Sequence, residues 1–572
     1  MYDSIPSEYK IDVSKGMLIG SGINLRKPNA EIEDVFLPWK SLNSHFMCFG
    51  TTRQGKTRLM AFMMRQIIEK GDHLVVIEPK GSEGQEVMSW VAQYAVEHNS
   101  EKSILYWSPE YVDKSIKINL LYGQNDEEAT ATVSSSMKVE DEFYADIAEE
   151  ILMCVLPSLS FIEELEDKLV IEMFEKMEYA KALIESPINE INKKILNDFY
   201  DEDWDSIHVD IIGNFLDGEN GNGYSKEELE RAYKKAKAYQ DGKGEIPLRS
   251  FVTFEDLAQY TSQEKISTLY DYLENTLAEA KSNGTNPEII RRGEKASRNL
   301  EKLKNRDAGY FSKVSTSYAV TMSKLSTGNV GKLLCGSRVN ILKDRFFESG
   351  SRVILIAQPF PMVYGKTANM ITMMLMSMLN STVASVGTTG VSLERRIHVC
   401  SDESGSVANG QLLSLANKGG GLAISLYLYS QSFADYKDVL GEDGATILAD
   451  NSNTKTFFLV NDDKSAETIS AIIGGKKRGD VTYGHNEGAT SRGQGRAVDE
   501  QLIPPHLIMQ LQPMTFVMKT GSEVYMMQAP FQKDPFLEIF MGGKNHKKRA
   551  DKFSRYIQQQ REQDINIGKN YD

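Results

Sequence analysis

The stretch Gly50–Thr57 reads GTTRQGKT and matches the pattern G-x-x-x-x-G-K-[S/T] of a phosphate-binding loop. It follows a short apolar run, Phe46–Phe49, and precedes residues 58–70, whose apolar positions cover one face of a helix. Only ~0.02 chance matches to this pattern are expected in a chain of this length and average composition. The motif in this setting therefore predicts a strand, a loop and a helix that together bind a nucleoside triphosphate.

The chemistry of phosphate binding explains the residue types in this loop. Glycines let backbone N–H groups surround phosphate oxygens, and the amino end of the following helix adds positive potential. We expect Lys56 to contact the β- and γ-phosphates of ATP and the hydroxyl of Thr57 to ligate Mg²⁺. ATP and Mg²⁺ are thus the predicted cofactors.

Such a loop also needs a carboxylate that holds Mg²⁺ and, often, a second carboxylate that activates the attacking water. Asp402 and Glu403 directly follow the apolar run Ile397–Ser401, so we assign Asp402 to the metal and Glu403 to the base. The alternative is an ordinary acidic strand end. Gln431 ends a later apolar run and is either a sensor of the γ-phosphate or a loop residue, and His398 is expected to be a packed strand residue.

The predicted site has three groups of residues. The catalytic residues are Lys56, Glu403 and Gln431, and the metal ligands are Thr57 and Asp402. The nucleotide contacts are Gly50, Thr51, Thr52, Arg53, Gln54, Gly55, Lys56, Thr57 and Asp402.

The rest of the chain alternates between two kinds of pattern. Leu74–Ile77 is a second apolar run, so a strand, a loop, a helix and another strand follow one another, which predicts a parallel sheet. From about residue 125 to residue 305 the pattern is charged and helical, with long amphipathic stretches at 147–177, 225–240 and 262–281 and a loop at 213–223. Short apolar runs return later, at residues 352–357, 397–401, 422–429 and 455–460.

The predicted fold class is α/β: a RecA-like P-loop nucleotide-binding domain with a mainly parallel sheet, plus an inserted all-α domain. The predicted bounds are an entry segment at 1–45, the nucleotide-binding domain at 46–125 and 310–540, the all-α insertion at 126–309, and a polar basic tail at 541–572.

The composition limits the kinds of partner. The chain has 572 residues and a formal net charge of −15, so any contact with DNA must use local basic segments. Gly474–Gly479 and Ser491–Arg496 are such segments, and we interpret them as flexible loops that contact DNA phosphates, contact a neighbouring subunit's nucleotide, or are simply solvated. The four cysteines are widely spaced, which disfavours zinc and fits a reducing cytosol. No apolar run reaches the ~20 residues that span a bilayer.

The order of several motifs resembles the type IV secretion coupling proteins, the RecA-like motors of bacterial conjugation. These motifs are GTTRQGKT, VVIEPKG, SDES, LYLYSQSFADY and NSNTKTFFLVNDDKSAETIS, in that order, with a helical insertion after the second. The resemblance covers residues 40–125 and 310–530. It departs from the family pattern in lacking the usual transmembrane helices at the start, and in having Glu78 where aspartate is commoner.

The resemblance implies a function and a set of partners. Members of this family form hexameric rings that bind DNA and pass relaxase-bound substrate to the secretion channel. In such rings a neighbour's arginine completes the ATP site, and Arg338, Arg345 and Arg352 are the candidates. The predicted location is cytoplasmic, docked at the inner membrane through partners. The alternatives are a related DNA-pumping or pilus-assembly ATPase, and a recruitment scaffold that hydrolyses ATP slowly.

Overall fold

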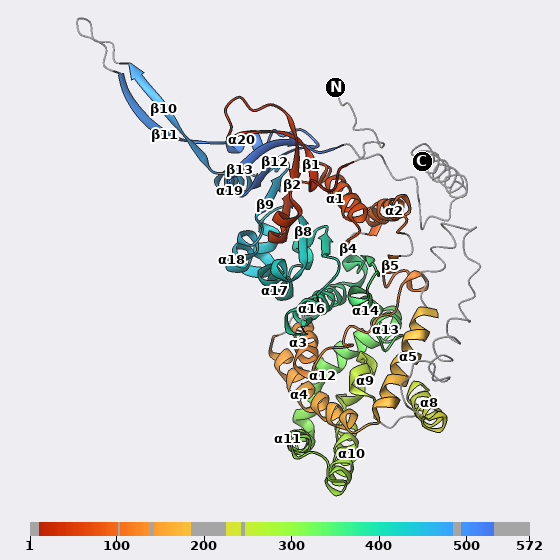
Figure 1. Ribbon diagram of the computed structural model, residues 1–572. Helices are drawn as coiled ribbons and strands as arrows, with labels where there is room; N and C mark the ends of the chain where they lie inside the picture. The colour runs from red at the N-terminus through yellow and green to blue at the C-terminus, as the bar shows by residue number, and fades with distance from the viewer. Residues whose placement is uncertain are drawn as a thin grey trace, which may run out of the picture. The chain divides into compact units, whose positions relative to one another are not determined.

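The computed structural model describes residues 11–79, 81–100, 103–137, 142–184, 225–241, 246–389, 392–483 and 493–530 (Figure 1). The chain divides into two compact units. We call residues 1–77, 86–94 and 396–535 the nucleotide-site unit, and residues 78–85, 95–395 and 536–572 the helical unit. The predicted polar tail and the predicted loop at 213–223 lie outside the described residues.

A mixed sheet forms the core of the nucleotide-site unit. Within this unit its strands lie in the order β2-β1-β13-β12-β9-β3-β8-β7-β4. Their bounds are β1 (Met17–Asn24), β2 (Glu33–Leu37), β3 (Phe46–Phe49), β4 (His73–Ile77), β7 (Ile397–Ser401), β8 (Ile424–Ser430), β9 (Thr454–Phe457), β12 (Thr515–Thr520) and β13 (Glu523–Gln528). The strands from β9 to β4 pair in parallel, and those from β2 to β9 pair antiparallel. The predicted α/β class with a mainly parallel sheet is therefore confirmed.

The parallel part of the sheet has the sequence pattern of strands covered on both faces. Every residue of β3, β4, β7 and β8 is buried, which explains why these strands are continuous apolar runs rather than alternating ones. Helix α1 (Lys56–Lys70) packs on β1, β4 and β7. It ends at Gly71, whose φ of 90° and N–H bond to the carbonyl of Ile68 make a left-handed cap.

The register of the parallel strands determines where the chain leaves the sheet. Phe49 at the end of β3 is opposite Ser430 at the end of β8, and Ser401 at the end of β7 is opposite Leu428. The three strands thus end at one edge of the sheet. The loops that begin at Gly50, Asp402 and Gln431 start there, which is where α/β proteins bind their ligands.

The remaining α-helices of the nucleotide-site unit lie between its strands in the sequence. They are α17 (Gly410–Lys418), α18 (Ala434–Asp450), α19 (Asp463–Ile473) and α20 (Pro505–Ile508), together with the central part of α2 (Gly81–Glu97). Between α19 and α20, strands β10 (Gly475–Tyr483) and β11 (Gly493–Gln501) form an antiparallel ribbon that extends away from the sheet (Figure 1). The prediction of loops at Gly474–Gly479 and Ser491–Arg496 was therefore wrong for most of these residues, because their polar, glycine-rich sequence concealed the strand pairing.

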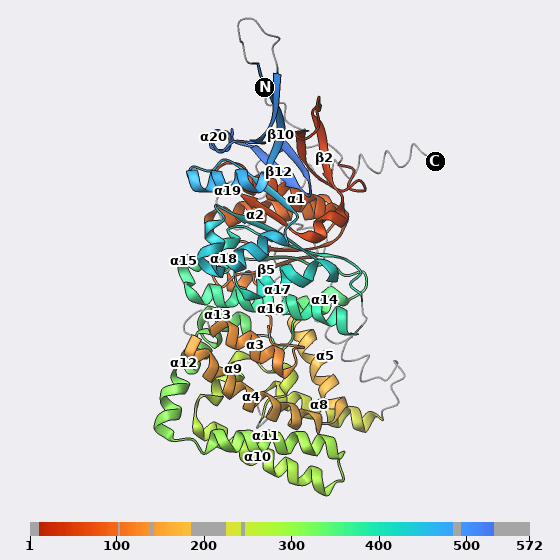
Figure 2. The same cartoon turned by 90° about the vertical axis from the view of Figure 1, so that its left-hand side faces the viewer.

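The helical unit consists mainly of packed helices. Their bounds are α3 (Asp126–Met137), α4 (Glu142–Glu164), α5 (Lys168–Ile184), α8 (Lys226–Gln240), α9 (Phe254–Ala258), α10 (Gln263–Ser282), α11 (Pro287–Lys304), α12 (Ala308–Ser326), α13 (Gly328–Leu334), α14 (Ile341–Phe347), α15 (Pro361–Tyr364) and α16 (Lys366–Thr389). Helices α4, α10 and α11 pack against one another (Figure 2). The unit also holds the parallel strands β5 (Ile104–Trp107) and β6 (Ile354–Ala357).

The predicted helices are present with one change. The stretch expected at 147–177 is two helices, α4 and α5, separated at residues 165–167. Helices α8 and α10 lie where the sequence predicts them. The domain bounds given above, with the insertion at 126–309, stay a prediction.

One described helix is long and apolar enough to cross a membrane by length and composition. It is Lys366–Gly387 within α16, and 67% of its apolar window is buried inside the protein. Burial of this extent is typical of a core helix of a globular unit.

Candidate nucleotide-binding site

The P-loop connects β3 to α1 and depends on its two glycines. Gly50 has a φ of 152° and Gly55 a φ of 109°, conformations that residues with a side chain rarely adopt. A Cβ added to Gly50 would lie 2.5 Å from the Cβ of Phe458, so the backbones approach too closely for any side chain. Arg53, between the glycines, is itself left-handed with a φ of 61°. The loop therefore has the tight curvature that phosphate binding requires.

Lys56 begins α1 and lies inside the loop rather than in solvent. Its side chain is buried, and its ammonium group donates hydrogen bonds to the carbonyls of Gly50 and Thr51, the latter at 2.8 Å. A positive charge held against the backbone of the loop is suited to bind phosphate oxygens.

Thr57 and Asp402 meet at the same edge of the sheet. The Thr57 hydroxyl donates to Oδ2 of Asp402 at 3.3 Å, and the Asp402 side chain is buried. The backbone N–H of Asp402 donates to the carbonyl of Ile77 on β4, 3.1 Å away, which fixes the start of this loop. A hydroxyl beside one carboxylate fits Mg²⁺, which is usually held by few protein ligands together with phosphates and water. No cluster of three or more His, Cys, Asp or Glu that could hold a metal occurs among the described residues.

Glu403 and Gln431 are hydrogen-bonded to each other. Nε2 of Gln431 donates to Oε1 of Glu403 at 3.3 Å, and the carbonyl of Gln431 accepts from the N–H of Gly50 at 3.2 Å. Glu403 has a left-handed backbone, with a φ of 44°, and its N–H donates to Oδ1 of Asp402. Strained conformations of this kind cluster at functional sites. Gln431 thus links the P-loop to the predicted base, which favours its interpretation as a site residue.

Asp435 supports Gln431 and was not predicted from the sequence. Its Oδ2 accepts from the hydroxyl of Ser430 at 2.6 Å and from the N–H groups of Gln431 at 3.1 Å and Ser432 at 2.9 Å. Ser432 and Asp435 form the pattern S-x-x-D, which often begins a helix and could have revealed this contact.

His398 is a packed residue, as the sequence predicts. It is buried in β7, with Nε2 2.9 Å from Asp72 and Nδ1 2.8 Å from the hydroxyl of Tyr427. Burial lowers the pKa of His398. Burial would raise the pKa of Asp72, but hydrogen bonds from His398 and Lys70 outweigh it and lower that pKa to about 2.

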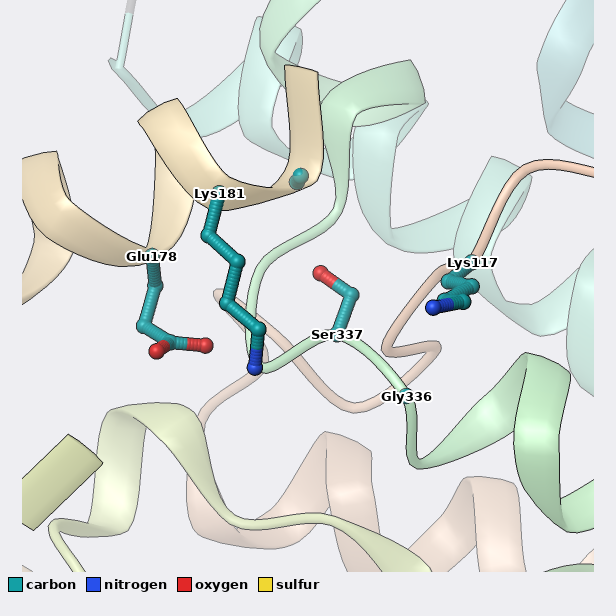
Figure 3. A pocket seen from close by; sticks show the side chains of 6 residues that line it. Lys117, Glu178, Lys181, Gly336 and Ser337 are labelled. Atoms are coloured by element: carbon teal, nitrogen blue, oxygen red, sulfur yellow. The ribbon is translucent and has the colours of Figure 1, made fainter. Parts of the chain in front are cut away.

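Two of the three candidate arginines have partners within the helical unit. Arg338 binds both carboxylate oxygens of Asp256, the shorter contact being 2.8 Å, and Arg352 donates to the hydroxyl of Ser100. The same unit has a small pocket lined by Lys117, Glu178, Lys181, Ala182, Gly336 and Ser337 (Figure 3). None of the predicted site residues lines it.

Comparisons with known proteins agree with this fold. Residues 29–97 match the family described as "Type IV secretion-system coupling protein DNA-binding domain", and residues 396–513 match "TraM recognition site of TraD and TraG". A search of curated proteins found no match.

Solved structures of the coupling protein TrwB have a similar fold. An unbound form is 13% identical with a TM-score of 0.50, covering 89% of this chain and 90% of that one. A complex with ADP and Mg²⁺ is 14% identical with a TM-score of 0.50, covering 89% and 91%. A trigonal form with sulphate is 14% identical with a TM-score of 0.51, covering 89% and 91%.

The sheet, the P-loop and the carboxylates at its edge define a RecA-like P-loop nucleotide-binding protein. The two family matches contain the two halves of the site, Gly50–Thr57 in the first and Asp402, Glu403 and Gln431 in the second. Two segments of this chain are thus similar to parts of the type IV secretion coupling proteins.

Proposed function

We propose that this chain is an ATP-driven coupling protein that recruits relaxase-bound DNA, or a protein substrate, and delivers it to a type IV secretion channel during conjugation. The observation that carries the proposal is the site itself, in which the P-loop, Asp402, Glu403 and Gln431 meet at one edge of the sheet. Matches to two coupling-protein regions support the same role.

Each site residue has a task in hydrolysis. Lys56 binds the β- and γ-phosphates, and Thr57 and Asp402 are the residues that would hold Mg²⁺, which neutralises phosphate charge when bound. Glu403 accepts a proton from the attacking water, and Gln431 orients Glu403 through the 3.3 Å hydrogen bond. The hydrogen bond between Gln431 and Gly50 would relay the state of the nucleotide to the strand end of β8.

The assembly and location follow from the same proposal. The active form is a homo-hexamer in which a neighbour completes the ATP site, and the partners are DNA, relaxosome proteins and channel components. The TrwB structure with ADP and Mg²⁺ supports the choice of an adenine nucleotide and Mg²⁺, and another TrwB structure holds a GTP analogue. The chain acts in the cytoplasm and docks at the inner membrane through partners.

A transfer assay tests the proposed role. Donor cells carrying the native element with Lys56→Ala should transfer DNA at least a hundredfold less often than the wild type, because phosphate binding is lost. Lys418→Ala removes an exposed lysine on α17, outside the site, and should leave transfer unchanged. Normal transfer by the Lys56→Ala element, or by one lacking the gene, would contradict the proposal.

A further inference from the structure

A turn from the end of the nucleotide-site unit packs directly on the P-loop. Met514 lies between α20 and β12, and its N–H donates to the carbonyl of Gln54 at 2.9 Å. A Cβ added to Gly55 would lie 2.4 Å from the sulfur of Met514. The Met514 side chain therefore occupies the space beside Gly55.

The backbone of Met514 is held in a conformation that methionine disfavours. Its φ is 65°, in the left-handed region, which is unfavourable for a residue with a Cβ. Neighbouring hydrogen bonds hold the turn: the carbonyl of Met514 accepts from the N–H of Ala529 at 2.7 Å, and the N–H of Thr515 donates to the carbonyl of Gln512 at 3.0 Å. The fold thus keeps a methionine, rather than a glycine, in a strained position against the loop.

The other half of the P-loop is held by the residues that follow β9. Phe458 is the residue that excludes a side chain at Gly50, and the carbonyl of Leu459 accepts from the N–H of Thr51 at 2.9 Å. The rings of Phe458 and Phe516 pack with centroids 4.9 Å apart. Two segments therefore contact the P-loop, one at each half. Met514 makes the contacts with Gln54 and Gly55.

We propose that Met514 is a positioning residue of the nucleotide site. It holds Gln54 and Gly55 in the conformation that directs their backbone N–H groups toward phosphate before ATP arrives. A loop that is already ordered loses less conformational entropy on binding, so the contact raises the affinity for nucleotide. The inference rests on the nucleotide site of the proposed function and names a residue outside the P-loop that regulates it.

Removing the Met514 side chain tests its role in nucleotide binding separately from any role in stability. Met514→Gly should raise the Kd of the full-length chain for fluorescent ATP·Mg²⁺ about tenfold, since the freed loop must be ordered on binding. The thermal midpoint should stay within a few degrees of the wild type, because glycine adopts a positive φ without strain. Met514→Leu restores the bulk and should bind within about threefold of the wild type. In turnover, KM should rise while kcat changes little.

A matched control tests whether strain relief alone has this effect. Ala423 is also left-handed, with a φ of 69°, at the cap before β8, so Ala423→Gly makes the same backbone change without contacting Gly55. It should leave the Kd unchanged. An equal loss of affinity in Ala423→Gly would show that the change of a left-handed residue to glycine weakens binding without any contact to Gly55, and would overturn the inference.

The variant Lys56→Ala distinguishes failure of the positioning role of Met514 from failure of the proposed nucleotide site. If Lys56→Ala loses ATP binding while Met514→Gly binds like the wild type, the positioning role is wrong and the nucleotide site stands. If the wild type itself does not bind ATP·Mg²⁺, both are wrong.

Discussion

His45 illustrates how a single buried side chain can set the response of the fold to pH. It lies immediately before β3, with Nε2 2.9 Å from the carbonyl of Ala416 and Nδ1 accepting from the N–H of Leu426 at 3.2 Å. Only the neutral ring with its proton on Nε2 satisfies both neighbours. Burial, with a smaller contribution from Arg396, lowers the pKa of His45 to about 4, although the bond to Ala416 opposes the shift.

The pKa of His45 predicts a loss of stability in mild acid. Between pH 6.5 and about 4 the unfolded chain binds a proton at His45 that the folded chain does not, so the free energy of unfolding falls as pH falls. From pH 7 to pH 5 this group should contribute a loss of about 2 kcal/mol. Urea denaturation at the two pH values measures it.

Two histidine variants isolate this contribution. In His45→Asn the difference between pH 7 and pH 5 should shrink by about 2 kcal/mol, because the titrating group is gone. His506→Asn removes an exposed histidine of α20 and should leave the difference as in the wild type. An undiminished difference in His45→Asn would show that another group causes the loss.

At the scale of elements, the apolar runs predicted the centre of the sheet well. Strands β3 and β7 have the predicted bounds, because strands buried on both faces appear as continuous apolar runs. The outer strands β12 and β13, and the ribbon of β10 and β11, were missed because they include polar and glycine residues. Their pairing depends on distant partners that a local pattern does not contain.

The candidate site was predictable to the same extent. Lys56, Thr57 and the pair Asp402 and Glu403 belong to motifs that follow buried strands. Because parallel strands end at one edge of a sheet, the sequence pattern predicted that these residues lie close together. Met514 carries no motif, and its contact with Gly55 arises from the path of the chain after α20. Whether each residue has its assigned role stays a prediction.

The ion pair between Arg338 and Asp256 connects two segments of the helical unit that are distant in sequence. Arg338, before α14, binds the buried carboxylate of Asp256 on α9 and also donates to the carbonyl of Phe251 at 3.1 Å. Asp256 in turn accepts from the N–H of Thr253, which begins α9. Removing the arginine would leave a buried charge with only part of its partners.

The pair predicts a large effect of one substitution. Arg338→Ala should lower the free energy of unfolding by about 3 kcal/mol, because Asp256 loses its countercharge in a buried site. Lys304→Ala breaks the more exposed pair with Asp271, 3.0 Å long, and should cost less than about 1 kcal/mol. Chemical denaturation of the variants, followed by helical circular dichroism, measures both. Equal effects would show that burial of the Arg338 pair has no consequence for stability.

At the scale of the whole molecule, the chain joins two distant sequence regions into one site. Residues 78–85 and 95–395 belong to the helical unit, and the P-loop and the acidic pair lie in sequence on either side of them. The net charge of −15 disfavours general attraction of DNA, so DNA would have to bind through local basic surfaces. ATP hydrolysis is therefore the part of the proposed cycle that a purified chain can test most directly.

Steady-state ATP hydrolysis by the full-length chain, with and without single-stranded DNA, is that test. We predict that the wild type hydrolyses ATP with Mg²⁺, that Lys56→Ala abolishes both binding and turnover, and that Glu403→Gln keeps binding while its kcat falls at least a hundredfold because the base is lost. Lys418→Ala should behave as the wild type. Turnover in Lys56→Ala or Glu403→Gln equal to that of the wild type would contradict the account.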